Sequence, residues 1–257
     1  MCFDADARPP LPPIHGAAID SRDVTLTSAD GTQFAAFGSC AEQPSGAGVV
    51  IIPDVRGLHP YYEELALRFA EAGVDAVAVD LFGRTAGAEK RGADFSYEEH
   101  VRQTRPESVD ADIAAAAAYL RTDAGGNPER VYTLGFCFGG RVSFLQATAG
   151  LALAGVVGFY GWPTGSHRTG SPAPADKAQD FGCAVLAIFG GADQGIGPDA
   201  RAEFDRALDA AGVSHTTVVY DGAPHSFFDR KQAEFAEASA DAWRQVLDFM
   251  GRPQRPV

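Results

Sequence analysis

Three residues that lie far apart in the chain, a cysteine, an aspartate and a histidine, could together perform nucleophilic chemistry. Cys137 lies in Gly-Phe-Cys-Phe-Gly-Gly at 135–140, after the apolar run 131–134 and before a helical pattern. Glycines two positions either side of the cysteine suit a sharp strand-to-helix turn, because side chains there would collide with the neighbouring strand and helix. Such a turn raises the sulfur above the sheet, beside a helix N-terminus that favours thiolate. The pattern predicts that Cys137 is a nucleophile.

A thiol nucleophile needs a base, and an imidazole base needs an acceptor that fixes its tautomer. Asp193 follows the apolar run 184–189, and His225 follows the last predicted strand, in Ala-Pro-His-Ser-Phe at 223–227. Both residues are therefore expected at the carboxyl edge of the sheet, where Cys137 is also expected and where open α/β sheets bind ligands. The order nucleophile, acid, histidine predicts a catalytic triad on an α/β-hydrolase fold.

Each of the three residues has a simpler interpretation when taken alone. Cys137 could be a buried core cysteine, Asp193 a turn or cap carboxylate, and His225 a histidine of a surface loop. A dinucleotide-binding turn is disfavoured, because the glycines are spaced G-x-x-x-G-G and not G-x-G-x-x-G. The combination in this order favours the triad over these alternatives.

Short apolar runs alternate with longer helical segments over most of the chain, which is typical of a parallel sheet covered on both faces. An antiparallel hairpin is expected first, at 24–27 and 33–37 around Ala29-Asp30-Gly31. Further strands are predicted at 48–52, 75–79, 131–134, 155–159, 184–189 and 216–219, and helices at 61–71, 109–121, 140–148, 199–211 and 231–250. The sequence thus predicts the α/β class, with a mostly parallel central sheet, helices on both faces and an N-terminal antiparallel hairpin.

The domain organisation is expected to be simple. Residues 1–20 contain four prolines and are expected to form an extended or disordered lead-in, and residues 21–257 a single domain. The segments 83–105 and 161–182 lack clear periodicity and are expected to be irregular loops that serve as lids or pocket walls.

Charge and cysteine content limit the partners and the compartment. The formal net charge of −13 disfavours nucleic acid and anionic membranes, but a local arginine can still bind an anionic small molecule. The four cysteines form no C-x-x-C pair, and no zinc-like grouping with the six histidines is present. We expect a cytoplasmic protein that is a monomer or small homo-oligomer, needs no metal or cofactor, and acts on a small-molecule ester or lactone.

These residues resemble the dienelactone hydrolase (carboxymethylenebutenolidase) family over roughly residues 24–250. The resemblance rests on Gly-Phe-Cys-Phe-Gly-Gly at 135–140, Pro-Asp-Val-Arg-Gly at 53–57, Asp-Leu-Phe-Gly-Arg at 80–84, Gly-Phe-Tyr-Gly at 158–161 and Pro-His-Ser-Phe at 224–227. It implies hydrolysis of an enol-lactone or related ester through an acyl-thiol intermediate, without a cofactor.

The resemblance also implies roles for further residues. Val55 and Phe138 would supply the backbone N–H groups of an oxyanion hole, and Arg84 would hold a substrate carboxylate. Asp54 stands where the family has a glutamate beside the thiol, so its shorter side chain puts the reach to Cys137 in question. Tyr160 is a candidate substrate-binding residue at a strand end and could equally be core.

Two other functions remain open at this stage. A broad-specificity esterase or thioesterase could use the same thiol chemistry, and substrate profiling would separate it from a lactone hydrolase. A ligand-binding or redox-sensing protein could keep the fold and a reactive thiol without turning over a substrate. The intact triad order disfavours that last alternative.

Overall fold

The computed structural model describes residues 8–11, 19–228 and 234–251 of the 257-residue chain. The strands are β1 (Ile19–Thr27), β2 (Gln33–Ala41), β3 (Ala47–Ile52), β4 (Val74–Val79), β5 (Arg130–Phe136), β6 (Gly155–Phe159), β7 (Ala184–Gly190) and β8 (His215–Tyr220). The α-helices are α1 (Pro60–Glu71), α2 (Gly83–Ala86), α3 (Tyr97–Gln103), α4 (Pro106–Leu120), α5 (Phe138–Leu145), α6 (Pro198–Ala211) and α7 (Ala236–Phe249). Three 3₁₀ helices are η1 (Asp123–Gly125), η2 (Gln146–Thr148) and η3 (Ala175–Asp180).

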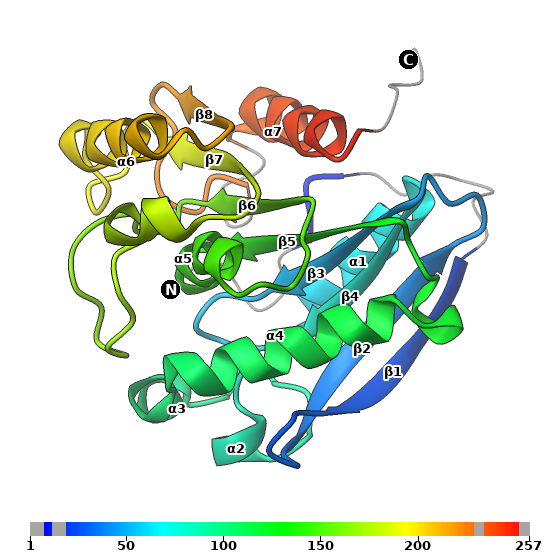
Figure 1. Cartoon of the computed structure of the whole chain (residues 1–257). Helices are drawn as coiled ribbons and strands as arrows, with labels where there is room; N and C mark the ends of the chain where they lie inside the picture. Colours follow the sequence, from blue (N-terminus) through cyan, green and yellow to red (C-terminus); the bar gives the residue numbers. More distant parts are fainter. Residues whose placement is uncertain (1–7, 12–18, 229–233, 252–257) are drawn as a thin grey trace.

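The strands of the described part of the chain form one sheet in the order β1-β2-β4-β3-β5-β6-β7-β8 (Figure 1). β1 pairs with β2, and β2 with β4, in antiparallel fashion, whereas the pairs from β4 across to β8 are parallel. The predicted fold class is confirmed, including the antiparallel hairpin at one edge. The hairpin strands are longer than predicted, because pairing continues through polar residues that carry no apolar alternation.

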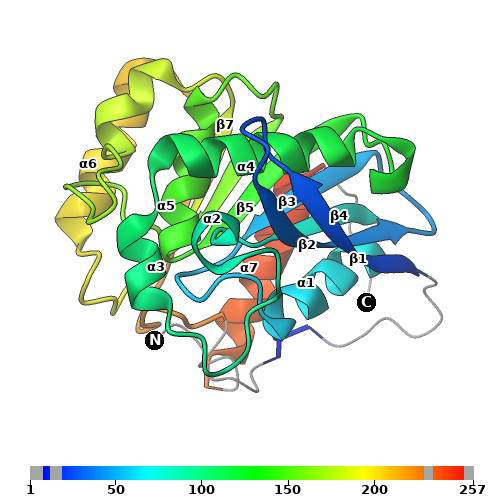
Figure 2. The ribbon, with the colours of Figure 1, turned by 90° about the horizontal axis from the view of Figure 1, so that it is seen from below.

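Helices cover both faces of the sheet, as the continuous apolar runs predict. Figure 2 shows α4 and α5 on one side of the sheet and α1 and α7 on the other. Along β3, Val49 and Ile51 belong to the core cluster that contains residues of α1, whereas Val50 and Ile52 pack with residues of α4. Burial on both faces excludes polar residues from β3, since an unpaired polar side chain would lose its bonds to water.

Two predictions about irregular segments are wrong in part. The segment 83–105 contains α2 and α3, and the segment 161–182 contains η3. α2 has four residues and α3 has seven, and helices this short form mainly because of tertiary packing and not because of the helix propensity of their residues. The predicted helix at 231–250 is observed from Ala236, and residues 231–233 lie outside the described part.

The predicted N-terminal lead-in lies mostly outside the described residues. Within it, Leu11 packs against the core, and β1 already begins at Ile19. None of the helices described here is both long and apolar enough to span a membrane.

Candidate active site

Cys137 occupies a strained turn between β5 and α5. Its φ of +55° lies in the left-handed region, which is uncommon for a residue with a side chain. A Cβ on Gly135 would lie 1.9 Å from the Gly139 oxygen, and a Cβ on Gly139 would lie 2.3 Å from the Ile52 and Pro53 oxygens. Only glycine fits at these two positions, so the glycine spacing in the sequence has the steric cause that the turn requires.

His225 and Asp193 are brought together from loops that follow β8 and β7. The Asp193 Oδ2 atom lies 2.7 Å from His225 Nδ1, and the Asp193 side chain is 2% exposed. The other carboxylate oxygen accepts the backbone N–H groups of Gly195 and Ile196 at 2.8 and 3.3 Å. These bonds fix both oxygens of Asp193, so the carboxylate can hold the imidazole in one orientation.

The ionisation of Asp193 follows from these contacts. Burial alone would raise the pKa of this carboxyl, but the hydrogen bond and charge of His225 and the two backbone N–H groups outweigh burial. The pKa of Asp193 is lowered from 3.8, so the residue is a carboxylate throughout the neutral range.

One pocket of about 510 Å³ contains the predicted nucleophile and the predicted base. Its lining includes Cys137, His225 and the two predicted oxyanion-hole residues, Val55 and Phe138. The other lining residues are Tyr97, Glu98, Arg141, Trp162, Thr164, Ser166, His167 and Arg168. The pocket therefore gathers residues from the carboxyl ends of several strands, as the fold predicts.

Two aromatic side chains enclose the imidazole of His225. The ring of Tyr160 lies 4.8 Å from it and the ring of Trp162 lies 5.0 Å from it, measured between ring centroids. Tyr160 is fully buried and is not among the pocket-lining residues, and a contact between Tyr160 and a substrate stays a prediction. Trp162 lines the pocket and also donates from Nε1 to the Gly195 oxygen at 3.1 Å.

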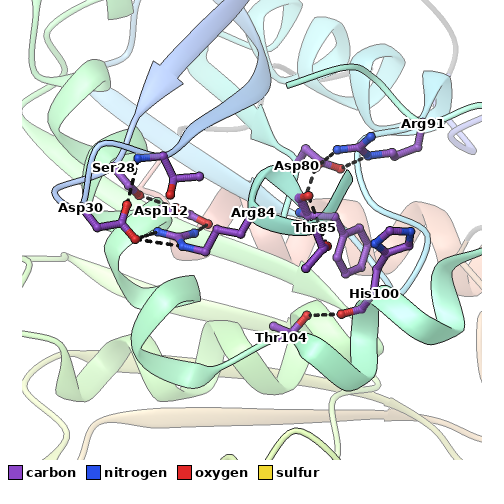
Figure 3. Close-up of polar contacts among 11 residues, drawn as sticks. Ser28, Asp30, Asp80, Arg84, Thr85, Arg91, His100, Thr104 and Asp112 are labelled. Atoms are coloured by element: carbon purple, nitrogen blue, oxygen red, sulfur yellow. Dashed lines mark hydrogen bonds and ion pairs between the residues drawn. The ribbon is translucent and has the colours of Figure 1, made fainter. Parts of the chain in front are cut away.

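Arg84 lies outside the lining of this pocket, contrary to the role that the resemblance implies for it. Its guanidinium binds Asp30 at 2.9 Å and Asp112 at 2.6 Å, and Figure 3 shows it directed at these two carboxylates. Asp112 also accepts a hydrogen bond from Ser28. A cation with two carboxylate partners is poorly placed to bind a third, and this placement argues against Arg84 as the substrate anchor.

Asp54 is fully buried on the loop after β3, and its Oδ1 accepts the backbone N–H of Arg56 at 2.8 Å. It is not among the pocket-lining residues. A contact between Asp54 and the Cys137 thiol stays a prediction.

A buried ion pair anchors the segment that leads into α3. Arg91 binds the fully buried Asp80 at 2.8 Å, as Figure 3 shows, and donates to the carbonyl oxygens of Ala86 and Gly87. The segment then enters α3, whose first two residues, Tyr97 and Glu98, line the pocket. The sequence pattern gave no sign of these two residues, because the segment lacks periodicity.

His167 is a second histidine of the pocket wall and was also not predicted as a site residue. Its ring stacks on Phe138 with 5.4 Å between centroids, and its Nδ1 lies 2.8 Å from the Thr169 hydroxyl. Burial, together with the charges of Arg141 and Arg168, lowers the pKa of His167 to about 4. His167 is therefore neutral at neutral pH.

In the described part of the chain, no group of three or more histidine, cysteine and acidic side chains is placed to hold a metal ion.

Comparison with known proteins agrees with the resemblance seen in the sequence. The sequence model of the "Dienelactone hydrolase family" matches residues 34–253. A Salmonella typhimurium protein named "Putative carboxymethylenebutenolidase" is 30% identical over 238 residues, covering 90% of this chain and 87% of its own. A Bradyrhizobium protein named "Probable 2-oxo-3-(5-oxofuran-2-ylidene)propanoate lactonase" is 29% identical over 210 residues, covering 79% of this chain and 82% of its own.

A solved structure from Klebsiella pneumoniae, titled as that of a "Putative Dienelactone Hydrolase", superposes with a TM-score of 0.81. It is 26% identical, and the match covers 92% of this chain and 100% of that one. Because the family model spans most of the chain, this protein belongs to the dienelactone hydrolase family.

Proposed function

We propose that this carboxylic ester hydrolase cleaves lactones or activated esters with Cys137 as nucleophile, His225 as base and Asp193 as the residue that orients the base. One observation carries the proposal: His225, bonded through Nδ1 to Asp193 at 2.7 Å, lines the same pocket as Cys137. The bond to Nδ1 leaves Nε2 as the nitrogen that can exchange a proton with the sulfur.

In the first half of the reaction, the Cys137 sulfur forms a bond to the substrate carbonyl carbon while its proton passes to His225. The carbonyl oxygen becomes an oxyanion, which the backbone N–H groups of Val55 and Phe138 would stabilise. Phe138 is the first residue of α5, where helix geometry leaves N–H groups without an intrahelical acceptor. Collapse breaks the carbon–oxygen bond, and the leaving oxygen takes the proton from His225.

In the second half, water attacks the thioester carbonyl and gives a proton to His225. The carbon–sulfur bond then breaks, and the sulfur recovers the proton. Asp193 stays ionised in both halves and stabilises the imidazolium form of His225.

The names of two relatives support the proposed substrate class. The lactonase name of the Bradyrhizobium relative and the butenolidase name of the Salmonella relative both describe opening of an unsaturated lactone ring. We extend that chemistry to this chain. Arg168 is an exposed cation of the pocket lining, and Glu98 is the one acidic residue among the lining residues, so the pocket is compatible with a negatively charged lactone.

Trapping of the acyl intermediate tests the proposal directly. The protein is mixed with an activated aryl ester, quenched in acid and mapped by peptide mass spectrometry. We expect an acyl adduct on the peptide that contains Cys137, which decays at the rate of product release. A burst of product with an adduct on another residue would overturn the nucleophile assignment. Iodoacetamide labelling of Cys137 without turnover of any ester or lactone would favour the binding or redox alternative.

A further inference from the structure

Arg141 is the largest fully buried side chain among the described residues, with a relative exposure of 1%. It lies on α5, one turn after the nucleophile, and its backbone N–H donates to the Cys137 oxygen at 3.2 Å. The proposed reaction gives it no task. Burial lowers the pKa of its guanidinium to about 10, so the group stays charged at neutral pH.

The partners of this buried cation are unusual. No carboxylate in the described ranges forms an ion pair with Arg141, although a buried charge ordinarily has one. Its guanidinium instead makes six hydrogen bonds, all to one loop that follows β6. The acceptors are the carbonyl oxygens of Trp162, Thr164, Gly165, Ser171 and Pro172 and the hydroxyl of Ser171.

The loop that Arg141 binds has cavities against it. Five loop residues line the pocket of about 510 Å³, namely Trp162, Thr164, Ser166, His167 and Arg168. Thr169, Ser171 and Pro172 line a second cavity of about 80 Å³. Side chains that line cavities have fewer packing partners on the side that faces the cavity. The hydrogen bonds of Arg141 hold the loop at five residues between Trp162 and Pro172 and add to the restraint that packing gives.

The first residue of that loop connects Arg141 to the predicted base. The Trp162 carbonyl accepts from Arg141 at 3.0 Å, and the Trp162 ring lies against His225 with 5.0 Å between centroids. The same ring donates from Nε1 to Gly195, whose N–H in turn donates to Asp193. Trp162 thus touches the histidine directly and the aspartate through one residue.

We infer that Arg141 is a positioning residue for the proposed triad: by clamping the loop, it sets Trp162 against the His225 ring and fixes the angle at which the imidazole meets the sulfur. The expected effect of Arg141 on kcat rests on the proposed function. The expected effect on the position of the loop rests only on the hydrogen bonds that Arg141 makes to it. A small error in the geometry of a base is costly, since a displacement of about 1 Å can lower a rate on the order of 100-fold.

The kinetic test compares R141M and R141K with a matched control, R121M. Arg121 also donates to loop carbonyls, those of Leu151 and Ala152, but it does not line the pocket. With p-nitrophenyl acetate, whose acyl group is too small to need the pocket wall, we expect kcat to fall about 10- to 100-fold in R141M. R141K, which keeps the charge and some donors, should recover part of kcat, and R121M should stay within about twofold of the wild type.

A double-mutant cycle with W162L tests whether the effect passes through Trp162. W162L removes the ring and keeps the carbonyl that Arg141 binds. If Arg141 acts through that ring, its replacement should cost little more kcat once the ring is gone, so the fold-losses in R141M and W162L should not multiply in the double variant. Fully multiplicative losses in kcat would overturn the inference. A loss confined to KM in R141M would also overturn it, because Arg141 would then shape only the substrate wall.

Trp162 fluorescence reports the loop without any turnover. In a W243F background, Trp162 is the one tryptophan left in the chain, and its emission should shift to longer wavelength in R141M and much less in R141K. Unchanged emission in R141M would refute the clamp. If R141M does not fold, S171A takes the place of R141M in the emission measurement, because it removes the hydroxyl that accepts a hydrogen bond from Arg141 Nε. If the wild-type protein hydrolyses no ester or lactone, the proposed function is wrong. The emission measurement would still show whether Arg141 holds the loop in place.

Discussion

The carboxylate of Asp193 lies 2.7 Å from Nδ1 of His225, although 32 residues separate the two in the chain. The loops after β7 and β8 meet because these two strands are parallel neighbours at one side of the sheet. For D193N, we expect kcat to fall on the order of 10⁴-fold, since an amide can present its N–H to the ring and favour the wrong tautomer. Steady-state kinetics on an activated ester measures the loss. A fall of less than about tenfold would show that His225 needs no carboxylate.

Cys137 is expected to be essential and the other described thiols dispensable. C137A should lower kcat/KM for aryl esters by about 10³-fold or more, because the acyl intermediate cannot form. Cys183 serves as the matched control: burial raises its pKa to about 11, and it does not line the pocket. C183A should therefore keep the wild-type rate. Near-normal hydrolysis by C137A would rule out the covalent mechanism.

Gly139 should tolerate no side chain. A Cβ there would lie 2.3 Å from the carbonyl oxygens of Ile52 and Pro53, so G139A must distort the turn that carries Cys137. We expect a loss of about 2 kcal/mol in the free energy of unfolding and little remaining activity. Urea denaturation and ester hydrolysis measure both. In G182A, where the nearest atom would lie 3.6 Å away, neither quantity should change much.

Arg84 is expected to matter for stability and not for substrate choice. R84M leaves the buried Asp112 without its guanidinium partner, and the free energy of unfolding should fall by about 2 kcal/mol. R84M/D112N should recover part of this loss, because the amide carries no charge. The ratio of kcat/KM for carboxylated and neutral esters should stay the same in R84M. A collapse of that ratio would restore Arg84 as the anchor for a substrate carboxylate.

Stability should fall as the pH is lowered from about 6.5 to about 4. Burial and neighbouring arginines lower the pKa of His167 to about 4, and burial with the charges of Arg56 and Arg8 does the same for His59. In this window the unfolded chain binds protons that the folded chain excludes, so protonation favours unfolding. H167Q should show a shallower decline in thermal melts between pH 4 and 6.5. An identical pH slope in H167Q and the wild type would contradict the low pKa of His167.

Much of this molecule could be predicted from the sequence because the relevant forces are local. Continuous apolar runs such as β6 (Gly155–Phe159) can be buried on both faces only in a covered sheet, and the glycines around Cys137 are needed for one sharp turn. The order of Cys137, Asp193 and His225, with each residue after a strand, then places all three at one edge of a parallel sheet. These inferences need no knowledge of which side chains meet.

Only the tertiary structure determines which arginines and aromatic rings lie at the pocket and which lie elsewhere. Nothing in the sequence shows that Arg84 is held by Asp30 and Asp112, since those partners lie 54 and 28 residues away. The one local sign of Arg141 is a charged residue among the mostly apolar residues of α5. Five of the six atoms in the loop that accept hydrogen bonds from Arg141 are main-chain carbonyl oxygens, which every residue type carries. Local periodicity reports which face of an element is buried, whereas the partners of a long charged side chain depend on how distant loops fold over the sheet.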